Sequence, residues 1–204
     1  MSPAHHHIAL PPGFVLHWYE IESILGQGGF GITYLARDTN LNHRVAIKEF
    51  LPSDLATRGE DSGITPFSSD HEETYVWGLE RFIGEAQTLA RFTHPHIVQV
   101  HTVFEANNTA YMVMQYLEGE NLENGFKLGR YLEENALRQI LLELMDGVEA
   151  IHQAGFIHRD IKPANILIRP DKSAVLLDFG SARQAISTKT KTLTAVVSPG
   201  SSTC

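Results

Sequence analysis

The sequence is poor in cysteine: Cys204 is its only one in 204 residues. One cysteine cannot form a disulfide within the chain, so a reducing compartment is indicated and we expect the protein to be cytoplasmic. No apolar run reaches the ~18 residues that a membrane-spanning helix needs. The N-terminal segment also lacks the apolar stretch of a signal peptide. We therefore expect no membrane segment in this chain.

Basic residues are also scarce, with 16 Lys and Arg against 24 Asp and Glu, which gives a formal net charge of −8. This balance argues against a general nucleic-acid binder. Apolar residues make up 43% of the chain, including 10 Phe and 2 Trp. That share is enough for a folded core and excludes global disorder.

Hydrophobic periodicity predicts the main elements. Apolar and polar residues alternate on both sides of a glycine cluster between Trp18 and Asp38, which predicts a hairpin. A turn at Asn107–Asn108 predicts a second hairpin. The remaining expected elements are a strand at 43–51, a loop or insertion at 52–72, a helix from Tyr75 to Phe92, a core-facing helix from Leu132 to Ala154 that Gly155 ends, and a short strand at 173–180. The apolar residues expected to face the core on the second helix are Leu137, Ile140, Leu141, Leu144, Met145, Val148 and Ile151.

This order of elements predicts two unequal lobes. We expect a flexible tail at 1–13 and a sheet-rich first lobe at 14–117, with an insertion at about 52–75. Residues 118–204 would form a second, helical lobe.

The glycine cluster Gly26-Gln27-Gly28-Gly29-Phe30-Gly31 matches G-x-G-x-x-G. Alone this is weak evidence, because such glycines also serve tight turns. In a dinucleotide-binding fold the motif joins a strand to a helix, whereas here the residues after Gly31 alternate like a strand. A glycine hairpin between strands can lie over a polyphosphate, because its backbone approaches the oxygens closely.

Lys48 ends the apolar run Val45-Ala46-Ile47. A lone lysine at a strand edge is most often simply solvated. The alternative is a cation for the α- and β-phosphates of a nucleotide, which needs a carboxylate to hold it. Glu85, on the inward side of the first predicted helix, is the candidate.

The stretch GFIHRDIKPANILI, residues 155–168, places charges between apolar segments. Asp160 and Asn165 lie five residues apart, and Asp178 ends the next predicted strand. Oxygen ligands of this kind suit Mg²⁺, and Asp160 could accept a hydroxyl proton. A charged turn would explain Asp160 and Lys162, but it would not explain Asn165 at the start of an apolar strand.

In combination, the glycine loop, Val45–Lys48, a helix Glu, HRDIKPAN and DFG resemble the eukaryotic-like (Hanks-type) bacterial serine/threonine protein kinases. The resemblance covers roughly residues 18 to 200. Phosphotransferases that act on small alcohols share the Asp, Asn and second Asp. Arg159 and Lys162 favour the protein kinases over them.

The resemblance implies an α+β, two-lobed protein-kinase-like fold, ATP and Mg²⁺ as cofactors, and proteins with Ser or Thr hydroxyls as substrates. Asp160, Lys162 and Lys48 match catalytic positions, and Asn165 and Asp178 match metal ligands. Met114 matches the gatekeeper position before the hinge, and Thr33 stands where the family usually has Val. The full set of implied nucleotide-binding residues is Gly26, Gln27, Gly28, Gly29, Phe30, Gly31, Thr33, Ala46, Lys48, Glu85, Met114, Gln115, Leu117 and Leu167.

Control by phosphorylation is a further implication. Arg159 before Asp160 is typical of kinases that respond to phosphate on the activation segment. That segment, residues 181–200, offers hydroxyls for autophosphorylation at Ser187, Thr188, Thr190, Thr192 and Thr194. Self-association of the chain is the alternative expectation.

Two departures from the family pattern stand out. Glu85 follows Lys48 by 37 residues, far more than the family usually shows, which is the basis for the insertion. The chain ends at Cys204, before the Ala-Pro-Glu motif that should follow. The alternative is therefore a C-terminally truncated, inactive fragment that binds nucleotide or acts as a protein-interaction module.

Overall fold

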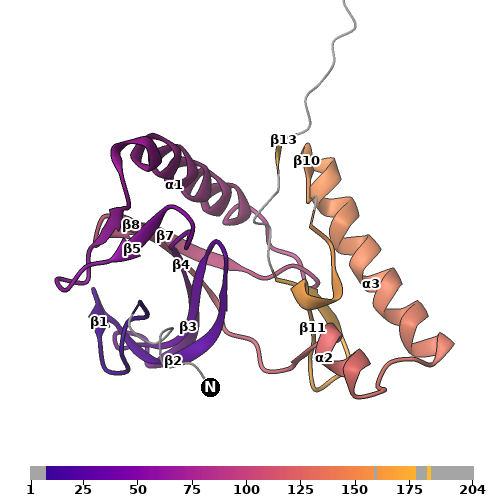
Figure 1. Ribbon diagram of the computed structural model, residues 1–204. Helices are drawn as coiled ribbons and strands as arrows, with labels where there is room; N and C mark the ends of the chain where they lie inside the picture. The colour runs from indigo at the N-terminus through magenta and orange to yellow at the C-terminus, as the bar shows by residue number, and fades with distance from the viewer. Residues whose placement is uncertain (1–7, 159, 178–182, 185–204) are drawn as a thin grey trace, which may run out of the picture.

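The computed structural model describes residues 8–158, 160–177 and 183–184. Its elements form two lobes joined by short segments (Figure 1). The first is a six-stranded antiparallel sheet with one long helix against it, and the second is mainly helical, as the predicted α+β class requires. The strands in sheet order are β1 (Val15–Leu16), β2 (Tyr19–Gly28), β3 (Gly31–Asp38), β4 (His43–Phe50), β8 (Thr109–Gln115) and β7 (Val100–Ala106).

Both predicted hairpins are confirmed. β2 and β3 meet at the glycine cluster, where Gly28 pairs with Gly31. β7 and β8 meet at Asn107 and Asn108, whose φ angles are 53° and 56°. Two successive residues in the left-handed region are what a tight hairpin turn with right-twisted strands requires, and asparagine tolerates that region better than most residues.

Of the two alternatives predicted for 52–72, the loop was wrong, and the insertion stays a prediction. Residues Ala56–Arg58 (β5) and Ile64–Pro66 (β6) form an antiparallel hairpin. Helix α1 then runs from Ser69 to Leu89, so it begins earlier than the predicted Tyr75. Its first turn is polar and carries Asp70 and Glu72, which complement the helix dipole but give no apolar periodicity. Apolar spacing therefore predicted the part of the helix that packs and not its polar first turn.

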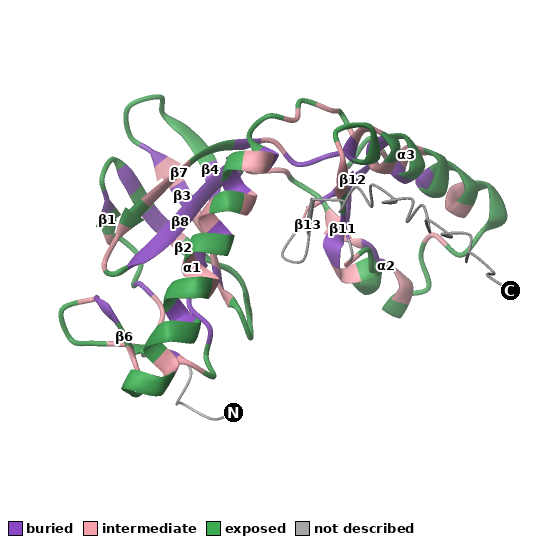
Figure 2. Ribbon diagram, turned by 90° about the horizontal axis from the view of Figure 1, so that it is seen from above, coloured by how far each residue is buried: buried purple, intermediate pink, exposed green. Residues whose placement is uncertain are grey.

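The second lobe is built around helix α3 (Glu134–Gln153). The helix buries Ile140, Leu144, Gly147 and Ile151, but Leu141 and Met145 are 58% and 65% exposed. Figure 2 shows this exposed side along α3. The prediction that the whole apolar set faces the core was wrong for these two residues. The other elements are β9 (Glu120–Asn121), α2 (Leu122–Lys127), β10 (Phe156–Ile157), the 3-10 turn Pro163–Asn165, β11 (Ile166–Ile168), β12 (Ala174–Leu176) and β13 (Arg183–Gln184).

The segment before β7 ties the lobes together. The amide of Val98 donates to the Leu176 carbonyl at 2.9 Å, and the Leu176 amide donates to the His96 carbonyl at 3.0 Å. Ile97 forms a parallel bridge with Leu176. Residues 96–98, which lead into β7, are thus paired with β12. This pairing links the two lobes beside the hinge.

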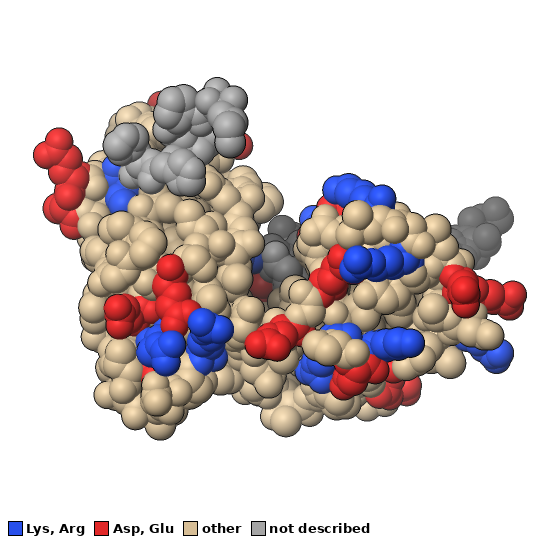
Figure 3. Space-filling model, turned by 90° about the horizontal axis from the view of Figure 1, so that it is seen from below, with Lys and Arg blue, Asp and Glu red and all other residues tan. Residues whose placement is uncertain are grey.

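One cluster of ion pairs lies on the surface of the first lobe. Glu22 bonds both Arg37, at 3.0 Å, and Arg44, at 2.9 Å. On the second lobe Arg130 pairs with Glu120 at 3.0 Å. Figure 3 shows one face on which basic and acidic side chains lie in small mixed groups. None of the helices in the described ranges has both the length and the apolarity to cross a bilayer.

Candidate functional site

The glycine loop joins β2 to β3 at the edge of the first lobe. A side chain at Gly31 would overlap the Glu49 carbonyl oxygen, so this position must be glycine for the fold itself. At Gly26, Gly28 and Gly29 a Cβ would meet no atom within 4 Å, and their φ angles are not positive. Packing therefore does not require glycine at these three positions. The open space above them leaves their backbone accessible to a ligand.

The residues that follow β4 hydrogen-bond to the backbone at the tip of the loop. The Leu51 amide donates to the Phe30 carbonyl, and the Ser53 amide to the Gly29 carbonyl, both at 3.1 Å. The Phe30 side chain is 80% exposed, and Gln27 is exposed as well. The loop is thus anchored through its backbone while its side chains stay in solvent.

Strand register gathers four of the predicted nucleotide-binding residues on one face of the sheet. Thr33 lies opposite Lys48, and Ala46 lies opposite Met114. Directly opposed residues project to the same face, as do residues two apart on one strand. Ala46 and Met114 are buried, whereas Thr33 and Lys48 are partly buried.

Glu85 lies on α1 beside the buried row of that helix. Ala86 and Leu89, its neighbours at one and four positions, are buried, and Glu85 itself is partly buried. Helix α1 packs on β7 and β8. Glu85 is therefore on the side of the helix that faces the sheet, as predicted.

Asp160 is the centre of a polar cluster in the second lobe. Lys162 Nζ donates to its Oδ2 at 2.8 Å, and Asn165 Nδ2 donates to the same oxygen at 3.0 Å. The Asp160 amide donates to His158 Nδ1 at 3.2 Å. The bond from Lys162, followed by that from Asn165, lowers the pKa of the Asp160 carboxyl below its ordinary value. Asp160 is consequently an ionised carboxylate at neutral pH.

Asn165 is positioned by the 3-10 turn and is 8% exposed. Its Nδ2 also donates to the Asp160 carbonyl at 3.0 Å, so Oδ1 is the side-chain atom that could coordinate a cation. An amide oxygen beside a carboxylate fits a hard cation such as Mg²⁺. In the part of the chain that the structure describes, no three His, Cys, Asp or Glu side chains gather into a metal site.

The other predicted ligand, Asp178, lies outside the described residues. The Leu177 amide donates to the Asn165 carbonyl at 2.9 Å, so the chain that leads to Asp178 runs beside Asn165. Arg159 and the hydroxyl residues of the predicted activation segment also lie outside the described residues.

The predicted hinge, residues 115–117, lies in the segment that crosses between the lobes, and Gly119 follows it in the same segment. The Gln115 amide donates to the Gln99 carbonyl at 2.9 Å. A Cβ on Gly119 would overlap the Ile168 carbonyl and lie 3.0 Å from Leu167 Cγ. The missing side chain lets the hinge approach β11 closely, which brings buried Leu167 near the segment that carries partly buried Leu117.

Sequence reasoning missed one feature next to this site, a buried ion pair between Glu49 and Arg58. A signal for it exists, because Glu49 continues the alternation that buries Val45 and Ile47. A carboxylate at such a position needs a buried partner. The partner itself could not be located, since it comes from the segment expected to be a loop.

Comparison with known proteins gives consistent matches. The model of the family described as "Protein kinase domain" matches residues 19–200. A probable serine/threonine-protein kinase of Bifidobacterium longum, pknA2, is 36% identical over 168 residues, which cover 82% of this chain and 20% of that protein. The serine/threonine-protein kinase PknA of Mycobacterium tuberculosis is 36% identical over 171 residues, covering 81% of this chain and 35% of that protein.

A solved structure, the apo form of PpkA-294, superposes with a TM-score of 0.82 at 40% sequence identity. The match covers 85% of this chain and 62% of that one. The chain therefore spans less than two thirds of that structure and about a third or less of these two curated relatives.

Proposed function

Because this chain belongs to the protein kinase family, we propose that it transfers the γ-phosphoryl group of ATP to Ser or Thr hydroxyls of proteins. The observation that carries this proposal is the cluster of Asp160, Lys162 and Asn165, with 2.8 Å and 3.0 Å contacts to one carboxylate oxygen. The cluster combines a proton acceptor, a cation and an oxygen ligand. Phosphoryl transfer needs these groups, because its catalysis is mainly positioning and charge stabilisation.

Asp160 would orient the attacking hydroxyl and accept its proton. Its lowered pKa keeps it ionised at neutral pH, so it can accept a hydrogen bond from the hydroxyl at once. Lys162, already bonded to Asp160, would place its positive charge near the transferred phosphate. Mg²⁺ would neutralise phosphate charge when bound, and Asn165 Oδ1 and Asp178 are the ligands that we propose for it.

The glycine loop and Lys48 would hold the ATP phosphates. The open space over Gly26, Gly28 and Gly29 supports this role, because packing gives no reason for glycine there. Gln27 and Phe30 complete the loop. Lys48 would pair with the α- and β-phosphates, with Glu85 as the carboxylate that orients it.

The adenine would lie between Ala46 from above and Leu167 from below. Met114 would line the inner end of this site, with Thr33 on the neighbouring strand. Backbone groups of Gln115 and Leu117 would bond the base edge. The shared sheet face of Thr33, Ala46 and Met114 supports this arrangement.

Transfer to the chain's own Ser and Thr residues is part of the proposal, because its sequence after Asp178 is rich in hydroxyls. We further propose a cytoplasmic location, on the strength of the single cysteine.

A radiolabelled phosphate-transfer assay on the purified 204-residue chain tests the proposed function. The chain is incubated with Mg²⁺ and ATP, alone and with a generic basic protein as acceptor. Asp160→Asn should lower the rate of transfer by about 100-fold or more, since positioned acid–base groups contribute on that order. Asp171→Asn makes the same chemical change at an exposed turn of the same lobe and should leave the rate unchanged.

Two results would overturn the proposal. One is an equal rate for Asp160→Asn and the unaltered chain. The other is a thermal shift with Mg-ATP but no transfer, which would identify a nucleotide-binding module instead.

A further inference from the structure

Glu49 is a fully buried carboxylate directly after Lys48, at 0% exposure. Because side chains alternate along β4, Lys48 and Phe50 project to one face of the sheet and Glu49 projects to the other. The first face meets α1, and the second is covered by residues 8–10 and the β5–β6 hairpin. Burying an ionised group is costly unless it is paired and hydrogen-bonded. The contacts of Glu49 are therefore a strong structural constraint.

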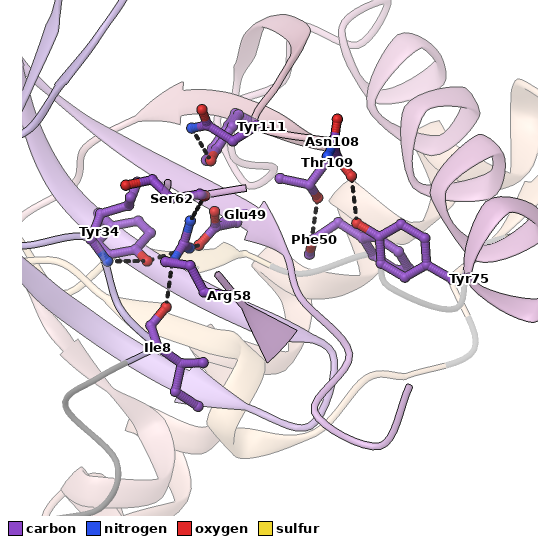
Figure 4. A network of polar contacts seen from close by, with 12 residues as sticks. Ile8, Tyr34, Glu49, Phe50, Arg58, Ser62, Tyr75, Asn108, Thr109 and Tyr111 are labelled. Carbon is purple, nitrogen blue, oxygen red and sulfur yellow. Dashed lines mark hydrogen bonds and ion pairs between the residues drawn. The ribbon is translucent and has the colours of Figure 1, made fainter. Parts of the chain in front are cut away.

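Arg58 of β5 supplies the opposite charge. Its Nη2 lies 2.5 Å from Glu49 Oε2, and its side chain is 5% exposed. Two further bonds use the rest of the guanidinium: Nε donates to the Ile8 carbonyl and Nη1 to the Ser62 carbonyl, both at 2.6 Å. Figure 4 shows the three directions in which Arg58 reaches. One side chain thus ties the hairpin and the N-terminal segment to β4.

Two tyrosines complete the surroundings of Glu49. Tyr34 Oη donates to Glu49 Oε2 at 2.8 Å and accepts from the Leu10 amide at 3.1 Å. Tyr111 lies directly opposite Glu49 in the strand register. Burial, followed by the charge of Glu49, raises the pKa of both phenols. Both hydroxyls therefore stay protonated.

The hairpin leads directly into α1. The Phe67 amide donates to the Leu55 carbonyl at 3.0 Å and closes the hairpin just before the helix starts at Ser69. The Ile64 amide donates to the Asn107 carbonyl, and Tyr75 Oη of α1 donates to the Asn108 carbonyl, both at 2.8 Å. The hairpin and the first half of the helix are therefore anchored to the same turn.

Phe50 makes the matching contact on the other face of β4. Its ring packs on Tyr75 and Phe82 of α1, with centroids 5.4 Å and 5.6 Å apart. A Cβ on Gly78 would lie 2.9 Å from the tip of the Phe50 ring. The helix thus approaches β4 closely at a point two residues beyond Lys48. The end of β4 is held on both faces at once.

We propose that Glu49 and Arg58 form a brace that positions α1, and with it Glu85, relative to Lys48. The brace consists of this ion pair and the β5–β6 hairpin. It rests on the proposed function, which assigns Lys48 and Glu85 to ATP binding. Glu49 and Arg58 act as positioning residues, because they reach the nucleotide only through the strand and the helix. The insertion between Lys48 and Glu85 is then the part of this kinase domain that sets its lysine–glutamate geometry.

The test compares the full chain with three variants. Glu49→Met/Arg58→Met replaces the pair with apolar side chains, a change that often preserves stability. Arg58→Lys keeps the charge but not the geometry of the three bonds. Glu22→Met/Arg44→Met removes a surface ion pair between β2 and β4, where Arg44 and Glu22 are 2.9 Å apart, and serves as the matched control.

Two readouts are needed. Amide hydrogen exchange of residues 69–89 without nucleotide reports on α1 alone. In the Glu49/Arg58 double variant, exchange in α1 should rise by about tenfold while exchange in β2 and β3 stays constant, as expected for a local opening. In the transfer assay, kcat/KM for Mg-ATP should fall by about 10- to 100-fold, a range typical of small displacements of binding groups. The exchange rate and the kcat/KM of Arg58→Lys should lie between those of the double variant and the unaltered chain. The control should match the unaltered chain in both readouts.

Unchanged exchange in α1 and unchanged kcat/KM would overturn the brace, because apolar packing alone would then be enough to position α1. A uniform rise in exchange over the whole first lobe would also overturn it. Such a rise would show that the ion pair stabilises the lobe as a whole and does not position α1 in particular. If the unaltered chain transfers no phosphate, the proposed function fails, and the exchange of α1 still decides whether the pair holds the helix.

Discussion

Gly28 and Gly31 lie three residues apart in the β2–β3 hairpin, but only Gly31 lacks room for a side chain. The pattern G-x-G-x-x-G does not distinguish them, because a sequence shows that glycine is present but not why glycine is needed. In the structure, one glycine serves the contact between β3 and the Glu49 backbone. The other faces open space, so packing gives no reason for glycine there, and we propose close approach of a bound nucleotide as the reason.

Replacing each glycine with alanine separates the two causes. Gly31→Ala should lower the free energy of unfolding by about 2 kcal/mol or more, because the new methyl group overlaps the backbone. Gly28→Ala should leave the unfolding midpoint in denaturant unchanged and weaken Mg-ATP binding, measured by titration calorimetry. Equal ATP affinity for Gly28→Ala and the unaltered chain would refute the role of the open loop.

The pKa of Asp160 depends on its contact with Lys162. Its hydrogen bond is the largest cause of the lowered pKa, so removing it must raise the pKa toward the ordinary carboxyl value. A base must be ionised to act, so activity falls as pH drops through that pKa. Lys162→Met should therefore move the acid limb of the pH–rate profile to higher pH, in addition to lowering the rate. Lys127→Met, at an exposed ion pair with Glu123, should leave the position of the limb unchanged, and an unmoved limb in Lys162→Met would contradict this account.

Among the elements, those with strong local patterns were predicted well. The two hairpins around the glycines and around Asn107–Asn108, and the helix that became α3, follow from alternation, turn chemistry and helical spacing. The β5–β6 hairpin could not be predicted, because its strands are three residues long, too short to show alternation. What stabilises it is Arg58, which contacts groups on β4 and near the N-terminus. Such distant contacts leave no periodic signal.

The free energy of unfolding should depend on whether Glu49 has its ion-pair partner Arg58. Arg58→Met alone leaves a buried carboxylate without its cation and should lower the free energy of unfolding by about 3 to 5 kcal/mol, as is usual when one partner of a buried pair is removed. Adding Glu49→Met should restore most of this loss. Urea unfolding of the single and double variants measures both values, and additive losses would show that the two residues are not coupled.

At the scale of the whole molecule, residues 115–119 and residues 96–98 connect the lobes within the part of the chain that the structure describes. In the first of these segments Gly119 lies against the Ile168 carbonyl, and the boundary near residue 117 stays a prediction. The second junction, between Val98 and Leu176, pairs residues far apart in the sequence and could not be foreseen. The same limit applies to the exposed Leu141 and Met145, because helical spacing shows that a face is apolar but not what covers it. The candidate site was predicted residue by residue through motifs, and its geometry depends on these junctions.

The central claim is that the two lobes assemble a phosphoryl-transfer site around Asp160. The most direct measurement is the initial rate of phosphate incorporation into Ser and Thr of an acceptor protein, with Mg-ATP and the purified chain. We predict measurable incorporation by the unaltered chain and a loss of about 100-fold or more in Asp160→Asn. No incorporation by the unaltered chain, or the same rate in both, would contradict the account.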